Sequence, residues 1–169
     1  MVELAAMSIG AISVTFLPAD QALAVAIFGW LLLPLAILDQ RHLWLPNRLV
    51  LLLEVGGAIM GPLLTPELDW TARAMGAAVG FLSLELIRHA YKHLRGIDGM
   101  GAGDPKLFGA LGIWLGWQEL PMTLLAASAL GLGLVLLMSR REAGHGAALP
   151  LGSYLAIAAW LVAVFAPGA

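Results

Sequence analysis

Long apolar runs separated by short polar segments dominate this sequence. A run of about 20 apolar residues predicts a helix that crosses a lipid bilayer. We expect six such helices, and they fall at residues 22–38, 46–64, 71–90, 106–117, 122–138 and 149–165. The fourth run is short, but polar or hinge residues lie on both sides of it, as they do for the other runs. The sequence therefore predicts an all-α, polytopic transmembrane helix bundle.

The beginning of the chain differs from this pattern. Residues 4–17 are apolar, but they fall short of the roughly 20 residues that a spanning helix needs, and residues 18–20 interrupt the run. We therefore divide the chain into an N-terminal apolar or interfacial segment, residues 1–21, and a six-helix transmembrane domain, residues 22–169. A further span within residues 4–17 is the alternative.

Composition agrees with a membrane protein. The chain of 169 residues is 60% hydrophobic and only 12% charged, whereas a soluble domain carries about 25% charged residues. Cysteine is absent, which excludes disulfides and thiolate metal sites. Three glycine pairs spaced four residues apart are expected to let helices pack closely: Gly57 and Gly61, Gly76 and Gly80, and Gly112 and Gly116.

The cations predict the orientation in the membrane. In the six-span arrangement, eight of the nine Lys and Arg residues fall on one side: Arg41, Arg48, Arg88, Lys92, Arg95, Lys106, Arg140 and Arg141. Only Arg73 falls on the other side. Because cytoplasmic loops carry the excess of Lys and Arg, the crowded side is expected to be cytoplasmic. Asp39 and Asp104 then lie at the cytoplasmic edge of the membrane.

These two carboxylates are the candidates for chemistry. A carboxylate at the edge of hydrocarbon is costly, so Asp39 is either a solvated interfacial residue or a functional one. Asp104, which is followed by a proline, is suited to cap a helix N-terminus. A helix cap does not need the preceding glycines Gly101 and Gly103, however. A protease has a use for them, because glycines without Cβ let an extended substrate backbone come close.

Taken together, the two aspartate segments resemble the motifs of the type IV prepilin peptidase family, which are intramembrane aspartyl proteases of the GxGD type. Asp39 precedes Pro46-Asn47, and Gly101-Ala-Gly-Asp-Pro-Lys106 is close to the second motif. The likeness covers most of residues 39–160. It implies that Asp39 and Asp104 are catalytic in an aspartic endopeptidase of the inner membrane. Family members remove a short basic leader from prepilins or pseudopilins of type IV pili and type II secretion.

The resemblance also implies a mechanism and a substrate site. Two neighbouring carboxyl groups share a proton, so one activates a water and the other hydrogen-bonds the scissile carbonyl. Asp104 is expected to face a helix N-terminus, which favours its charge, and Asp39 a C-terminus. Gly101, Gly103 and Lys106 are the expected substrate-binding residues, although Lys106 is as well explained by a lysine that reaches to water from the interface. No metal and no cofactor are expected.

Two acidic residues outside the motifs have separate interpretations. Glu54 is an acid within a predicted span, which makes it a functional candidate by default, but the resemblance supplies no role for it. Glu85 and Arg88 are three residues apart on a predicted helix and are expected to form a local ion pair.

Other functions stay open at this point. Many bacterial family members also methylate the new N-terminus and carry an extra N-terminal region with a cysteine-rich loop. Without cysteine, this chain is expected to be a peptidase-only short form. The alternatives are a non-catalytic assembly factor of a pilus or secretion system, or a small proton-coupled transporter, which the lack of an inverted repeat disfavours. The expected partners are prepilins or pseudopilins and the lipid bilayer, with no nucleic acid, and the sequence does not indicate an oligomeric state.

Overall fold

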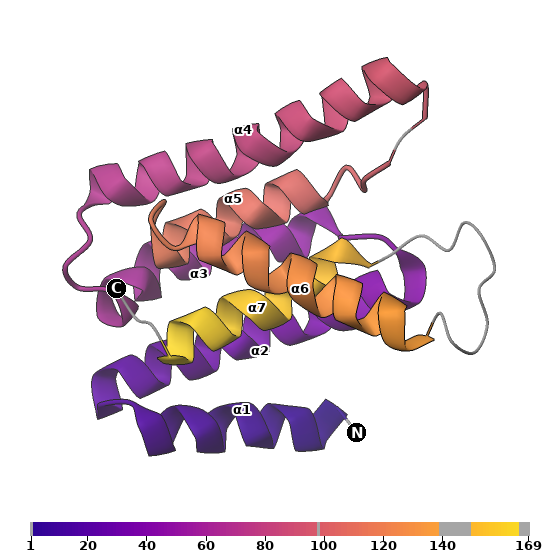
Figure 1. Cartoon of the computed structure of the whole chain (residues 1–169). Coiled ribbons are helices and arrows are strands. Elements are labelled where there is room, and N and C mark those ends of the chain that lie inside the picture. Colours follow the sequence, from indigo (N-terminus) through magenta and orange to yellow (C-terminus); the bar gives the residue numbers. More distant parts are fainter. Residues whose placement is uncertain (1, 98, 139–149, 166–169) are drawn as a thin grey trace.

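In the computed structural model, residues 2–97, 99–138 and 150–165 are described, and they form seven helices (Figure 1). The helices are α1 (Val2–Phe16), α2 (Ala19–His42), α3 (Asn47–Leu64), α4 (Trp70–Arg95), α5 (Asp104–Leu115), α6 (Leu120–Met138) and α7 (Leu151–Phe165). The all-α bundle predicted from the sequence is confirmed.

The short helix α5 lies at the centre of the bundle. It contacts α3, α4, α6 and α7, and ten of its 12 residues are buried. α1 and α4 form two opposite outer edges of the bundle, with the other helices between them (Figure 1). With 12 residues, α5 is too short to cross a bilayer alone. It is buried because neighbouring helices surround it.

Among the described residues, three helices are long and apolar enough to cross a membrane: α2, α3 and α6. α1 and α7 are apolar but shorter. The count of six spans therefore stays a prediction. Large apolar side chains point outward along the bundle, among them Leu82 and Leu86 on α4 and Leu125 and Leu132 on α6. So much exposed apolar surface is suited to lipid.

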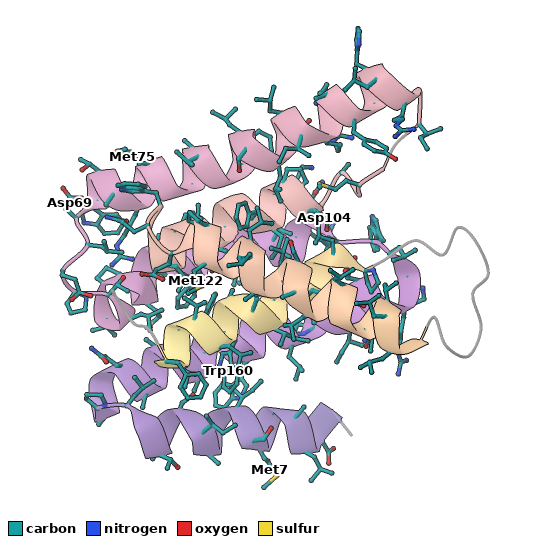
Figure 2. The ribbon with its side chains drawn as sticks, viewed as in Figure 1. Met7, Asp69, Met75, Asp104, Met122 and Trp160 are labelled. Carbon is teal, nitrogen blue, oxygen red and sulfur yellow. The ribbon has the colours of Figure 1, made fainter. Side chains whose placement is uncertain are left out.

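Residues 2–16 of the N-terminal segment form the helix α1, and residues 19–21 already belong to α2. α1 packs along α2, and the indole Nε1 of Trp30 on α2 donates to the carbonyl of Ala6 on α1 over 3.0 Å. Trp160 of α7 lies close to the same helix pair (Figure 2). The N-terminal segment is therefore packed against the membrane domain.

Two helices extend beyond the ends expected from their apolar runs. α2 continues to His42, so that Asp39 lies in its last turns, and α4 continues to Arg95. Both extensions carry basic residues in the last turn, where cations interact favourably with the partly negative C-terminus of a helix. The expected polar loop at 139–142 lies outside the described residues.

Of the spaced glycines, Gly76, Gly80 and Gly112 pack helix against helix as expected, whereas Gly116 follows the end of α5 with φ 80° and is its C-cap. A Cβ on either Gly76 of α4 or Gly112 of α5 would strike the backbone of the other helix. Gly80 lies similarly close to the backbone of Phe108. At these glycines the backbones of α4 and α5 are in direct contact. Small residues allow such close contact between membrane helices.

Arg73 joins three helices at one end of the bundle. Its guanidinium is almost fully buried and donates to the carbonyls of Gly61 (2.9 Å), Thr65 (2.6 Å) and Ile113 (3.0 Å). These carbonyls belong to the C-terminal ends of α3 and α5, where cations are favourable. Arg73 therefore fixes α3 and α5 to α4.

Asp69 begins α4 at this same end of the bundle. Its side chain accepts the N–H of Ala72 over 2.8 Å, and this bond lowers the pKa of Asp69. Asp69 and Asp104 lie toward opposite ends of the bundle (Figure 2).

Candidate active site

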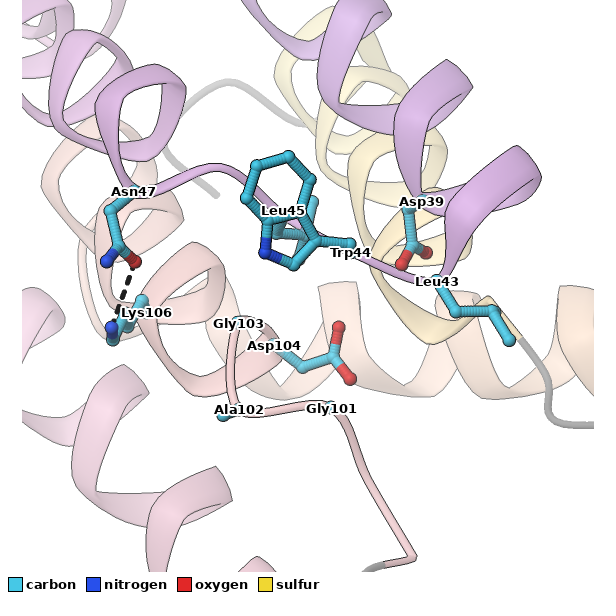
Figure 3. Close-up of a pocket in the computed structure, with 10 residues that line it drawn as sticks. All are labelled: Asp39, Leu43, Trp44, Leu45, Asn47, Gly101, Ala102, Gly103, Asp104 and Lys106. Carbon is cyan, nitrogen blue, oxygen red and sulfur yellow. Dashed lines mark hydrogen bonds between the residues drawn. The ribbon is translucent and has the colours of Figure 1, made fainter.

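Asp39 and Asp104 come together at one end of the bundle, from the last turns of α2 and the first residue of α5. Both residues are almost fully buried, with 4% of the surface of Asp39 and 5% of that of Asp104 exposed. A methyl group built on Gly152 of α7 would lie 3.0 Å from Oδ2 of Asp39 and 3.1 Å from Oδ1 of Asp104. The two oxygens are thus separated by no more than the sum of these distances, and both carboxyl groups face one cavity (Figure 3).

A left-handed turn places Asp39. Leu43 has φ 51°, ends α2 and donates its N–H to the carbonyl of Asp39 over 2.8 Å. The chain then reverses through Leu45 to Pro46, the N-cap residue directly before α3. Proline suits a helix start because it has no N–H to leave unpaired. The segment that follows Asp39 is therefore folded over the carboxylate.

The glycine-rich segment places Asp104. Gly103, and not Asp104, occupies the N-cap of α5, and Pro105 follows in the first turn. The interpretation of Asp104 as the helix cap is therefore not supported. Its carboxyl group is instead directed into the shared cavity (Figure 3).

The cavity between the motifs has a volume of about 260 Å³. Its lining residues come from the α2–α3 connection, the glycine-rich segment and the ends of α2, α3 and α5: Asp39, Leu43, Trp44, Leu45, Asn47, Gly101, Ala102, Gly103, Asp104 and Lys106. All five sequence-predicted site residues are in this set. In the described parts of the chain, no three His, Asp or Glu side chains gather in a way that would hold a metal ion.

The two predicted glycines face different neighbours. Gly101 is exposed at the cavity, and a Cβ there would lie 3.2 Å from Oδ2 of Asp104. A Cβ on Gly103 would come within 2.7 Å of the Cβ of Leu45. Gly103 has φ −82°, which any residue adopts. Gly103 is thus required for space against Leu45, and Gly101 leaves open space beside the carboxylate.

Lys106 joins the two motifs. Its Nζ donates to Oδ1 of Asn47 over 2.9 Å (Figure 3). Glu54, about two turns further along α3 than Asn47, shares a neighbouring cavity of about 280 Å³ with Asn47 and Lys106. Lys106 is therefore placed between the two aspartates and Glu54, and its ammonium group interacts electrostatically with Glu54. The ion pair expected between Glu85 and Arg88 forms on α4 at 2.7 Å, and neither residue lines the two cavities.

The first turn of α7 contacts Asp39, which the sequence interpretation missed. The backbone N–H of Ser153 donates to Oδ2 of Asp39 over 2.7 Å. Asp39 therefore lies at the N-terminus of α7 as well as near the C-terminus of α2, so the expectation that only Asp104 faces a helix N-terminus is incomplete. The local sequence offered one signal, a proline at residue 150 before the apolar run.

Comparison with known proteins agrees with these two motifs. The sequence profile of the type IV leader peptidase family matches residues 26–136, which include both aspartates and the glycine-rich segment. The chain belongs to the type IV leader peptidase family. The resemblance inferred from the sequence is confirmed.

Several relatives of this leader peptidase family member are similar over most of its length. One from Aeromonas hydrophila, a prepilin leader peptidase/N-methyltransferase, is 39% identical over 155 residues, which are 89% of this chain and 52% of the relative. One of the same name from Pseudomonas aeruginosa is 42% identical over 143 residues, 83% of this chain and 49% of the relative. The chain thus spans about half the length of these relatives. No solved structure matches it.

Proposed function

We propose that this chain is a membrane-embedded aspartic endopeptidase that removes the leader peptide from prepilins or pseudopilins. One observation carries the proposal: two buried carboxyl groups from distant helices, Asp39 and Asp104, meet at a cavity. Burying two acids side by side is costly for folding alone. Family membership and the names of the relatives support the choice of substrate.

The chemistry follows from the pair of carboxyl groups. Two carboxyls this close do not both ionise readily, so the pair holds one proton between them. The ionised carboxylate takes a proton from a water molecule, which attacks the scissile carbonyl carbon. The protonated carboxyl donates a hydrogen bond to the carbonyl oxygen as the tetrahedral intermediate forms, and the proton taken from water is then passed to the leaving amine. No covalent enzyme intermediate is needed.

The cavity supports binding of an extended peptide next to the aspartates. Gly101 is exposed and has no side chain between the cavity and Asp104. A peptide backbone can therefore approach the carboxyl group closely at this position. Lys106 at the far side of the cavity supplies a positive charge that favours an ionised dyad or a substrate carbonyl.

We further propose that the chain lies in the inner membrane with the aspartates at the cytoplasmic face. The last turns of α2 and α4 carry basic residues, and Asp69 lies toward the opposite end of the bundle from Asp104 (Figure 2). The positive-inside rule then assigns the aspartate end to the cytoplasm. A reporter fused after Arg95 should report a cytoplasmic location, and one fused after Asp69 should report the other side. The reversed pattern would contradict this orientation.

The cleavage proposal is tested with Asp39→Asn and Asp104→Asn, each co-expressed with a prepilin and followed on a gel that separates precursor from mature pilin. Each variant should leave the prepilin uncut, because an amide can neither accept the water's proton nor share one. Asp69→Asn is the matched control: asparagine caps a helix as well as aspartate does, so this variant should process normally.

Two other results of this cleavage assay would count against the proposed function. Normal processing by either aspartate variant, at the same membrane level as wild type, would contradict the aspartic mechanism. Absence of cleavage by the wild-type chain, together with pilus assembly that needs the chain, would favour the assembly-factor alternative.

A further inference from the structure

Ser153 contacts Asp39 through both its backbone and its side chain. The N–H donates to Oδ2 of Asp39 over 2.7 Å, and the hydroxyl Oγ lies 3.3 Å from the same oxygen. Oγ also lies 2.7 Å from the carbonyl oxygen of Ala36, one turn before Asp39 on α2. Only 1% of the Ser153 surface is exposed, and Ser153 does not line the cavity. It therefore acts on Asp39 and not directly on a substrate.

The two contacts of the hydroxyl compete for one hydrogen atom. A serine hydroxyl donates once and accepts through its lone pairs, and a backbone carbonyl such as that of Ala36 only accepts. When the hydrogen points to Ala36, the oxygen of Ser153 presents a lone pair to Oδ2 of Asp39. That contact is favourable when Oδ2 carries a proton. When Asp39 is ionised, rotation about the Cβ–Oγ bond turns the hydrogen to Oδ2.

We propose that Ser153 is a positioning residue that holds Oδ2 of Asp39 in both protonation states, by rotating its hydroxyl between Ala36 and Asp39. The backbone N–H of Ser153 holds the same oxygen throughout, since it belongs to the first turn of α7, where helix N–H groups have no partner within the helix. The proposal rests on the proposed function, because the protonation state of Asp39 changes during the reaction only if the aspartates form the catalytic pair.

Among the residues that the structure describes, the groups that face Asp39 come from four helices and are compatible with this arrangement. α5 contributes Asp104, which shares the proton, and Lys106 at the other side of the cavity. The facing residue of α3 is the neutral Asn47, and Arg41 and His42 follow Asp39 on α2 itself. The contacts from α7 are those of Gly152 and Ser153, which have no charge.

The test measures cleavage of a prepilin by purified protein, with kcat and KM determined separately. Ser153→Ala keeps the N–H and removes the hydroxyl. Since hydrogen bonds to charged groups are the stronger ones, kcat should fall by about tenfold to a hundredfold, with KM unchanged because Ser153 does not line the cavity. Ser153→Thr restores a hydroxyl and should recover most of kcat.

Ser13→Ala is the matched control. Ser13 is also buried, and its hydroxyl donates to the carbonyl of Ile9 within α1 over 2.8 Å. The control should leave both kinetic constants unchanged. Thermal unfolding in detergent is measured for every variant.

Three results would overturn the inference: wild-type kcat in Ser153→Ala, a loss of kcat that tracks a loss of thermal stability, or no recovery in a folded Ser153→Thr. The aspartate variants in the same assay keep the two proposals apart. If Asp39→Asn and Asp104→Asn cleave normally, the proposed function fails. If they are inactive while Ser153→Ala is normal, only the role of Ser153 fails.

Discussion

Lys106 donates a hydrogen bond to Asn47 over 2.9 Å, and this bond connects the two segments that carry the catalytic candidates. Asn47 is the first residue of α3, after the turn that follows Asp39, and Lys106 lies in the first turn of α5, two residues after Asp104. Fixing Lys106 to Asn47 thus fixes the relative position of the starts of α3 and α5. The bond therefore helps to set the shape of the cavity between them.

We expect Asn47→Asp to keep cleavage near the wild-type rate, because a carboxylate also accepts from Lys106. Asn47→Leu removes the acceptor and should slow cleavage by a few-fold, since an exposed bond contributes about 1 kcal/mol or less. Processing rates on one prepilin at matched protein levels measure both. A larger loss in Asn47→Asp than in Asn47→Leu would contradict a role for this bond.

Gly152→Ala should abolish most activity. The added methyl group would lie 3.0 Å from Oδ2 of Asp39, 3.0 Å from Cδ1 of Leu45 and 3.1 Å from Oδ1 of Asp104. It would separate the two carboxyl groups, and a displacement of about 1 Å in an active site can cost roughly a hundredfold in rate. Gly133→Ala on α6 is the matched control, because a Cβ there meets no atom within 4 Å. Equal cleavage rates in the two variants would contradict the close approach of the aspartates.

Gly103→Ala should lose more activity than Gly99→Ala. A methyl group on Gly103 would meet the Cβ of Leu45 at 2.7 Å, and Leu45 is buried in the segment that covers the cavity. A methyl group on Gly99 would instead meet the ring of Tyr91, which is 42% exposed and has room to move aside. Processing rates of the two variants give the comparison. The opposite order would show that the glycine-rich segment does not act through Leu45.

Arg73→Met should destabilise the protein without a specific effect on catalysis. The variant removes the guanidinium donor from three carbonyl oxygens at the ends of α3 and α5, and a hydrogen bond that involves a charged group contributes about 1.5–3 kcal/mol. Arg73→Lys should recover only part of the stability because lysine lacks the planar fork. Thermal unfolding in detergent measures both variants. An unchanged unfolding temperature in Arg73→Met would contradict the role of Arg73 in joining these helices.

The apolar runs predicted the number and order of the helices of the membrane domain, but not all of their ends. The apolar pattern places the end of the first span at residue 38, before Asp39 and the cations that follow it, whereas α2 continues to His42. The third apolar run likewise ends at residue 90, whereas α4 continues to Arg95. Polar residues mark where a helix leaves hydrocarbon, but they do not end it, because a basic last turn is compatible with the helix dipole.

The aspartates were predictable and Ser153 was not. Asp39 and Asp104 each stand in a local pattern, a Pro-Asn pair downstream and a glycine-rich segment upstream. Ser153 contacts Asp39 across 114 residues of sequence, and a serine near a helix start is by itself most simply explained by local hydrogen bonding. Only the packing of α7 against α2 reveals its partner.

The most direct test of the paired aspartates compares purified Asp39→Asn, Asp104→Asn and the double variant for their rates of prepilin cleavage. Groups that act as a unit are strongly non-additive, so removing either one costs about as much as removing both. We predict that the two single variants and the double variant share the same residual rate. Measurable cleavage by one single variant, with a further loss in the double variant, would contradict a single catalytic pair.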